Sequence, residues 1–193
     1  MYGFQNEDFL KTLNGAVAQI SEINRIADKV SDLGYKNIYL VGTGGTYAII
    51  SPLAYMLKTN STLVWYHEIA AELLAAKPRS LTRDSLFITA SLSGTTKETI
   101  AAAEYARSMG ATVISFVGDR TAPLAAVSDY VVENAACNDN LVEELHIQFF
   151  ALGARLMLKN GEFPQYERFV ETLRKMPEVL LKVREQNDER ALA

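Results

Sequence analysis

The 193-residue chain has few of the residues on which disulfide and metal sites depend. It contains one cysteine, Cys137, and two histidines, His67 and His146. A single cysteine cannot form an internal disulfide, and so few soft ligands do not favour a structural zinc site. We therefore expect a protein of the reducing cytoplasm that holds no metal ion and no other cofactor.

An excess of charge of one sign and long apolar runs are also lacking. The net charge is −4, and the lysines and arginines are spread along the chain rather than clustered. No apolar run approaches the roughly 18 residues of a membrane span, and the N-terminus lacks the basic and then apolar pattern of a signal peptide. We expect neither nucleic acid nor a membrane as a partner.

Apolar residues are plentiful, at 49% of the chain, and many fall into short runs separated by helical patterns. The runs predict five strands, at residues 37–41, 62–66, 85–89, 112–117 and 130–132. The remaining patterns predict helices, at residues 7–33, 47–57, 67–76, 97–109, 123–127, 140–158 and from Pro164 onward. Strands that alternate with helices indicate an α/β fold, here a three-layer α/β/α sandwich with a five-stranded parallel sheet in flavodoxin-like order.

These elements divide the chain into an N-terminal helical segment (1–34), a ligand-binding domain (35–160) and a C-terminal helical segment (161–193). Asn14 and Gly15 predict a break in the first helix, and Pro52 predicts a bend or a later start for the helix at 47–57. The helix at 140–158 has a broad apolar face. Because an exposed face of that width is a liability in a monomer, we expect a homodimer.

The most informative stretch is the loop Ala90–Thr99, with the sequence ASLSGTTKET, which follows the third strand and opens a helix. Its hydroxyl side chains surround Gly94; they are Ser91, Ser93, Thr95 and Thr96. At a helix start, free N–H groups and the positive end of the helix dipole favour an anion, and hydroxyls can donate hydrogen bonds to phosphate oxygens. The alternative is structural, because Thr95 followed by Glu98 is also a capping box.

A second loop, Gly42–Thr46, follows the first strand and is rich in glycine. In a flavodoxin-like order the first and third strands are neighbours, so both loops should lie at the C-terminal edge of the sheet, where the order reverses. Two loops that each favour an anion and share one crevice predict the reversible capture of a phosphorylated metabolite.

The same glycines could belong to a dinucleotide-binding fold, with Glu68 as the acid that binds ribose. The full G-x-G-x-x-G motif requires a glycine at the position of Tyr47. Neither loop contains a Walker A motif, and Ser91 and Ser93 do not lie in the G-x-S-x-G motif of hydrolases. An NAD-dependent oxidoreductase is therefore the weaker alternative.

Three motifs, TGGTY at 43–47, HEIAAELL at 67–74 and SLSGTTKET at 91–99, together resemble the SIS (sugar isomerase) domain. Within that family the chain resembles the first half of the two-domain ketosamine-6-phosphate deglycases and the isomerase part of glucosamine-6-phosphate synthase. The resemblance implies isomerisation of a sugar phosphate, or C–N cleavage of a fructosamine 6-phosphate. The residues that it implies for sugar-phosphate binding are Gly44, Gly45, Thr46, Ser91, Leu92, Ser93 and Thr96.

Either reaction moves a proton next to a carbonyl or imine, so it needs a positioned acid and base. In the deglycases these groups come from a motif similar to SGEFxHGP in the second half, which this chain does not contain. The resemblance therefore implies a first half, with residues 161–193 leading toward a second. Candidates within this chain are Glu68, Glu144 and His146, although Glu144 could simply be an acid at a helix start and His146 a packed ring. A non-catalytic sugar-phosphate sensor is the other alternative.

Overall fold

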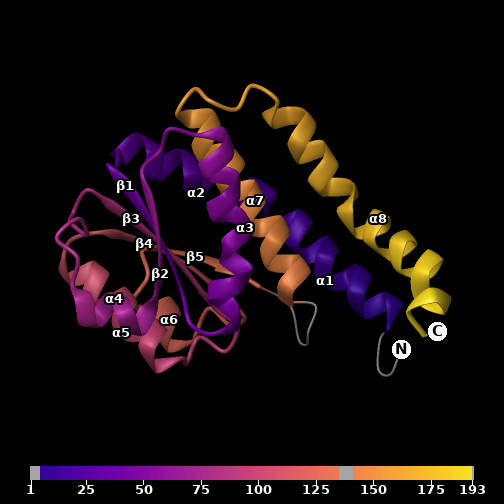
Figure 1. Cartoon of the computed structure of the whole chain (residues 1–193), viewed down its shortest axis with the longest axis horizontal. Coiled ribbons are helices and arrows are strands. Elements are labelled where there is room, and N and C mark those ends of the chain that lie inside the picture. The colour runs from indigo at the N-terminus through magenta and orange to yellow at the C-terminus, as the bar shows by residue number, and fades with distance from the viewer. Residues whose placement is uncertain (1–4, 135–140, 193) are drawn as a thin grey trace.

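The computed structural model describes residues 5–134 and 141–192, so Cys137 and the predicted helix start at Asn140 lie outside the described residues. Its centre is a sheet of five parallel strands in the order β2-β1-β3-β4-β5 (Figure 1). The strands are β1 (Asn37–Gly42), β2 (Trp65–Ile69), β3 (Ser85–Ser91), β4 (Thr112–Val117) and β5 (Tyr130–Glu133). This is the predicted flavodoxin-like order, and it confirms the α/β/α fold class.

Helices cover both faces of the sheet because each central strand is apolar on both sides. In β1, Ile38 and Leu40 face one core, while Tyr39 and Val41 face the other. The first core is closed by α2 (Ile20–Leu33), α3 (Gly45–Asn60) and α7 (Leu141–Lys159). The second is closed by α4 (Ala70–Ala76), α5 (Lys97–Ser108) and α6 (Pro123–Ala126). Figure 1 shows these two layers on either side of the strands.

The N-terminal helix is interrupted, but not where Asn14 and Gly15 predicted. Both residues lie inside α1 (Asn6–Ala18), and the interruption falls at Gln19. The Gln19 side chain donates a hydrogen bond to the carbonyl of Glu133 at the end of β5. The residue at the break thus contacts a residue that lies 114 positions further along the chain. Gly34 ends α2 with a φ of 80°, as a glycine at that position allows.

Two other boundaries differ from the prediction. The helix α3 starts at Gly45, earlier rather than later, and Pro52 lies inside it. The strand β2 starts three residues later than predicted, because the backbone N–H and the hydroxyl of Thr62 both donate to the Glu162 carboxylate instead of joining the sheet. His67 and Glu68 therefore belong to a strand and not to a helix.

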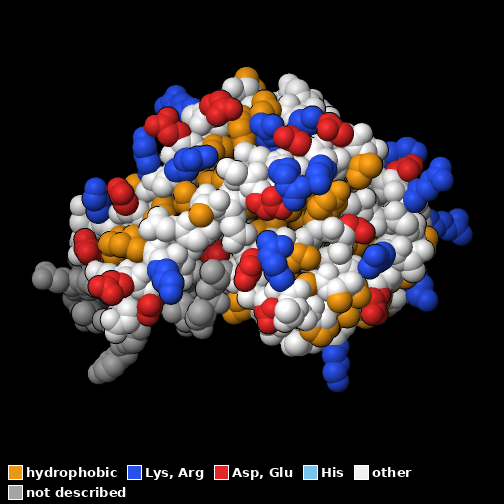
Figure 2. Space-filling view, turned by 180° about the vertical axis from the view of Figure 1, so that it is seen from behind, with side chains coloured by type: hydrophobic (Ala, Val, Ile, Leu, Met, Phe, Trp, Pro, Cys, Tyr) orange, Lys and Arg blue, Asp and Glu red, His pale blue; other side chains and the backbone are white. Residues whose placement is uncertain are grey.

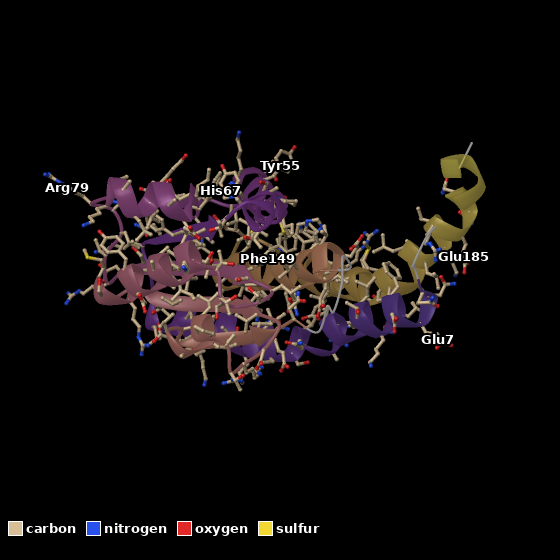
Figure 3. All side chains as sticks on the ribbon, turned by 90° about the horizontal axis from the view of Figure 1, so that it is seen from below. Glu7, Tyr55, His67, Arg79, Phe149 and Glu185 are labelled. Atoms are coloured by element: carbon tan, nitrogen blue, oxygen red, sulfur yellow. The ribbon has the colours of Figure 1, made fainter. Side chains whose placement is uncertain are left out.

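The broad apolar face of α7 is covered within the chain. This helix contacts α1, α2, α3 and α8 (Tyr166–Leu192). Phe149 packs edge-on against Phe116 of β4, with ring centroids 4.7 Å apart, and Figure 3 shows Phe149 in the interior. Arg155 binds Asp28 of α2 through two hydrogen bonds of 2.8 Å. Packing inside one chain thus accounts for the width of this face, and the homodimer stays a prediction.

The long helix α8 runs beside α1, away from the sheet (Figure 1). Phe9 and Leu13 of α1 form a small core there with Met176 and Leu180 of α8. On the face drawn in Figure 2, basic and acidic side chains are interspersed. Within residues 5–134 and 141–192, no helix has the length and apolar character needed to cross a bilayer.

Candidate functional site

A cavity of about 360 Å³ lies at the C-terminal edge of the sheet, between the loop after β1 and the loop after β3. The structure therefore brings together the two loops that the sequence singled out. The residues that line the cavity are Thr43, Gly45, Thr46, Ile49, Ser91, Leu92, Ser93 and Thr96. Every predicted sugar-phosphate residue is among them except Gly44, which immediately precedes α3.

Both loops depend on a glycine with left-handed backbone geometry. Gly44 has a φ of 56° and is the N-cap residue of α3. Gly94 has a φ of 61°, and a Cβ atom there would lie 2.4 Å from the Cβ atom of Ala122. The Gly94 carbonyl also accepts a hydrogen bond from the N–H of Leu124, at 3.0 Å. The loop after β3 is therefore pressed against α6, which fixes its position.

Two helices of more than ten residues begin at the cavity, α3 and α5. Neither N-cap residue, Gly44 or Thr96, makes a side-chain hydrogen bond to its own helix in the described part of the chain. The Thr46 N–H donates to the Thr43 carbonyl at 3.3 Å, whereas the N–H groups of Gly45 and of the first turn of α5 keep their partial positive charge for a ligand. The capping-box alternative is wrong, because the cap residue is Thr96 and the Thr95 hydroxyl instead donates to Ser93 Oγ at 2.9 Å.

The hydroxyls around the cavity are paired with one another. Ser91 Oγ lies 3.0 Å from Thr96 Oγ1, and Thr43 Oγ1 lies 3.0 Å from Thr99 Oγ1. The Thr46 hydroxyl is committed to its own loop: it donates to the Thr43 carbonyl and accepts from the Thr43 N–H, both at 3.0 Å. Thr46 therefore shapes the loop with its side chain and has no hydroxyl proton left for a ligand.

Sequence reasoning missed two of the lining residues, Thr43 and Ile49. Thr43 directly follows β1 and carries a hydroxyl, so its position in the glycine loop was a usable signal. Ile49 lies one turn into α3, and only the phase of that helix, which begins at Gly45, places it at the cavity.

The three predicted proton-transfer residues do not line the cavity. Glu68 is half-buried in β2, and Glu144 is fully buried in the first turn of α7. His146 is half-buried, with its ring centroid 6.0 Å from that of Phe150. Burial lowers the pKa of His146, although the Glu143 carboxylate and the backbone of Ile49 oppose this shift. His146 thus lies behind the Ile49 side of the cavity.

His67 of β2 packs against the first turn of α3. Its ring stacks on Tyr47, with centroids 4.0 Å apart and an angle of 10° between the planes. His67 Nε2 lies 3.0 Å from the Tyr47 carbonyl oxygen, which can only accept, so Nε2 carries the proton. Burial lowers the pKa of His67, whereas the bond to Tyr47 and the Glu68 carboxylate oppose this. A neutral ring that donates to Tyr47 therefore buttresses the loop after β1.

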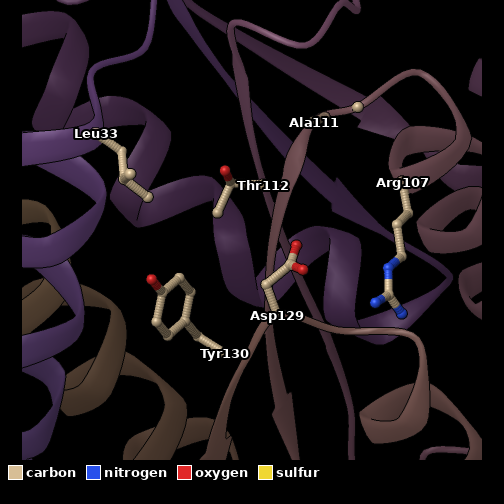
Figure 4. A pocket seen from close by; sticks show the side chains of 7 residues that line it. Leu33, Arg107, Ala111, Thr112, Asp129 and Tyr130 are labelled. Atoms are coloured by element: carbon tan, nitrogen blue, oxygen red, sulfur yellow. The ribbon is translucent and has the colours of Figure 1, made fainter.

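Two other hollows are poorer candidates. One, of about 350 Å³, lies at the opposite edge of the sheet, where β4 and β5 begin with Thr112 and Tyr130 (Figure 4). Its carboxylate, Asp129, already accepts the N–H of Val113 at 2.8 Å. The other, of about 530 Å³, is a mainly apolar groove between α3, α7 and α8 that includes Tyr55 and Phe169. Neither offers convergent N–H groups at the C-terminal edge of the sheet, where ligands of such folds bind.

The model of the SIS domain family matches residues 34–157. This chain belongs to the SIS domain family. Fructosamine deglycase FrlB of Bacillus subtilis (strain 168) is 28% identical over 178 residues, which are 88% of this chain and 54% of FrlB. The crystal structure of a proposed phosphosugar isomerase from Salmonella typhimurium LT2 is 26% identical, with a TM-score of 0.81 over 89% of this chain and 53% of that one.

A third similarity concerns the fold alone. The C-terminal domain of glucosamine-fructose-6-phosphate aminotransferase from Francisella tularensis is 15% identical, with a TM-score of 0.77 over 97% of this chain and 58% of that one. The chain spans about half the length of the relatives that it matches. Among the residues that the structure describes, no group of three or more histidine, cysteine and acidic side chains is arranged to hold a metal ion.

Proposed function

We propose that this SIS domain binds a phosphorylated sugar or sugar amine, with the phosphate in the cavity between the loops after β1 and β3. The observation that carries the proposal is the convergence of two helix N-termini and several hydroxyls on one hollow. Among the described residues, those that line the hollow carry no ionisable side chain. Recognition of the phosphate would then depend on hydrogen bonds and helix dipoles alone.

Each element has a distinct part in this proposal. The Gly45 N–H at the start of α3 and the N–H groups at the start of α5 face the anion, while Thr46 shapes the loop after β1 through its bonds to Thr43. Ser93 and Thr96 donate hydroxyl protons, and the backbone of Leu92 completes the cradle. Gly44 allows the backbone to turn into α3. A neutral hydrogen bond contributes about 1 kcal/mol, so such a set holds a metabolite reversibly.

For the reaction, we propose aldose–ketose isomerisation of a sugar phosphate or C–N cleavage of a fructosamine 6-phosphate. The similarity to FrlB supports the second. Because Glu68, Glu144 and His146 do not line the cavity, we propose that the acid and base come from a second SIS half or a second copy of the chain. In this proposal residues 1–34 are an N-terminal helical segment, 35–160 the binding domain, and 161–193 lead toward the second half.

Thermal unfolding with and without ligand tests the binding step. A ligand present at 100 times its dissociation constant stabilises the folded state by about 2.7 kcal/mol, which corresponds to a rise in Tm of roughly 5–10 °C for a chain of this size. We expect this rise with fructose 6-phosphate, glucosamine 6-phosphate or a fructosamine 6-phosphate. Fructose and NAD serve as controls. A rise with NAD alone, or equal rises with fructose and its phosphate, would contradict the proposal.

A non-catalytic sugar-phosphate sensor is the second candidate, and it is favoured by the lack of an acid or base among the lining residues that the structure describes. Incubation with fructose 6-phosphate in D2O separates the two. Exchange of deuterium into the carbon positions beside the carbonyl indicates proton transfer. If this chain, together with a second SIS half, binds the ligand but causes no exchange, the sensor is favoured.

The homodimer and the cytoplasmic location are also proposals. Light scattering on the purified chain tests the first, with an expected mass of twice 21.4 kDa. A single-chain mass at the highest concentration used would contradict it.

A further inference from the structure

One hydroxyl, that of Thr99, is buried behind the side chains that line the cavity. Thr43 is half-buried and lines the hollow, whereas Thr99 is 1% exposed and does not line it. Thr99 lies in the first turn of α5, and its Oγ1 is 3.0 Å from Thr43 Oγ1. This bond joins the loop after β1, which holds Thr43, to helix α5 after β3, which holds Thr99.

The direction of this bond follows from what each hydroxyl can reach. Buried hydroxyl protons are normally donated to an acceptor, because an unpaired buried donor is costly. Among the described residues, the hydrogen bond found for the Thr99 side chain is the one with Thr43. Thr43 lies at the cavity and has space in front of it. If Thr43 donated, the proton of Thr99 would be buried without an acceptor, so Thr99 is the donor.

We propose that Thr99 is a positioning residue for the phosphate site: by donating to Thr43 Oγ1, it directs the Thr43 hydroxyl proton into the cavity. This inference rests on the proposed function. The Thr43 carbonyl does not offer the Thr43 hydroxyl an acceptor, because it already accepts from the Thr46 hydroxyl at 3.0 Å and from the Thr46 N–H at 3.3 Å, which uses both of its lone pairs. A hydroxyl that accepts one hydrogen bond is also polarised to donate a stronger one.

A second pair of hydroxyls lies on the loop after β3, where both residues line the cavity. Ser91 is 4% exposed and its Oγ lies 3.0 Å from Oγ1 of the more exposed Thr96. At the outer rim, the Thr95 hydroxyl donates to Ser93 Oγ at 2.9 Å and leaves the Ser93 proton for the cavity. The cavity therefore presents oriented donors to its ligand. Such a wall suits a phosphate dianion, whose oxygens only accept, better than an alcohol.

The test is a double-mutant cycle at Thr43 and Thr99. Calorimetry measures the affinity of each variant for fructose 6-phosphate and for inorganic phosphate. Thr99→Val keeps the shape of the side chain and removes the hydroxyl; Thr99→Ser restores it. We expect Thr43→Val and Thr99→Val each to weaken binding about fivefold, the effect of one neutral hydrogen bond. Thr99→Ser should bind within about twofold of the unsubstituted chain. Thr59→Val, at the far end of α3, is the matched control and should leave binding unchanged.

The cycle distinguishes positioning from packing, because Thr99 should act only through Thr43. In the Thr43→Val background, Thr99→Val should cause no further loss of affinity. Equal losses in both backgrounds, or a Thr99→Ser variant as weak as Thr99→Val, would overturn the inference. Should Thr99→Val fail to fold, Thr99→Ala and Thr99→Ser give the same comparison. If the unsubstituted chain bound neither ligand, the proposed function itself would fail, which is a different result from unchanged affinity in Thr99→Val.

Discussion

Replacement of Gly94 by alanine tests the geometry of the site more directly than any other single change. The residue has a φ of 61°, and a Cβ atom would lie 2.4 Å from the Cβ atom of Ala122. The left-handed backbone costs a non-glycine residue about 1–2 kcal/mol, and relief of the overlap adds roughly 1–3 kcal/mol. We therefore expect Gly94→Ala to lower the free energy of unfolding by about 2–5 kcal/mol.

Two other glycines separate strain from overlap. Gly161 has a φ of 77° and Gly44 a φ of 56°, and a Cβ atom on either would have nothing within 4 Å. Gly161→Ala should therefore cost only the backbone strain, about 1–2 kcal/mol. Gly44 has a ψ of −121°, outside the left-handed helical region, so Gly44→Ala should cost about 1–3 kcal/mol of backbone strain. At roughly 2–4 °C per kcal/mol for a chain of this size, Gly94→Ala should lower Tm several degrees further than Gly161→Ala.

Ligand binding completes this comparison. Gly94→Ala moves the loop that carries Ser93 and Thr96, so the affinity for fructose 6-phosphate should fall, whereas Gly161→Ala, between α7 and α8, should leave it unchanged. Chemical denaturation gives the free energies and calorimetry the affinities. The reasoning would be refuted if Gly94→Ala were as stable as Gly161→Ala, because the loop would then not be pressed against Ala122.

Two further predictions concern single side chains. Ser93→Ala and Thr96→Ala should each weaken binding of fructose 6-phosphate by about 1 kcal/mol, one neutral hydrogen bond, and unchanged affinity in the double variant would refute the site assignment. Burial raises the pKa of Glu162, but hydrogen bonds from Ser61 and Thr62 outweigh it and bring the pKa to about 2, below its ordinary 4.5. Its stabilisation is therefore present above pH 4.5 and lost as the pH falls toward 2. Glu162→Gln should be less stable at pH 7, on the order of 1–2 kcal/mol after solvent screening, and should lose less on acidification; parallel pH curves of the two proteins would contradict this.

Local patterns were sufficient to predict most of the sheet. Strand β4 was predicted with its observed bounds, and β1 and β3 within two residues, because their apolar runs reflect burial on both faces. Strand β2 was misplaced because Thr62 bonds to Glu162, a hundred residues along the chain. At the break between α1 and α2, the Gln19 side chain likewise bonds to a residue distant in sequence, Glu133. Contacts distant in sequence leave no local pattern, so these two boundaries could not be read from it.

The site shows the same division. The hydroxyl excess around Gly94 and the glycines after β1 were enough to place both loops at one cavity. Which hydroxyl keeps a proton for a ligand was not readable, because it depends on pairs such as Thr43 with Thr99, which are joined only by the fold. That Glu144 and His146 do not line the cavity was equally hidden, since it depends on how α7 packs among its neighbours.

The neutral wall of the cavity has a consequence for the effect of acidity on binding. A phosphate monoester gains its second negative charge at a pKa near 6, and the side chains that form the wall do not titrate in that range. Affinity should therefore follow the ionisation of the phosphate ester rather than the ionisation of the protein. Between pH 5 and 8 the binding curve would then report the second ionisation of whichever ester is offered, and would shift from one ester to another with that ester's own acidity.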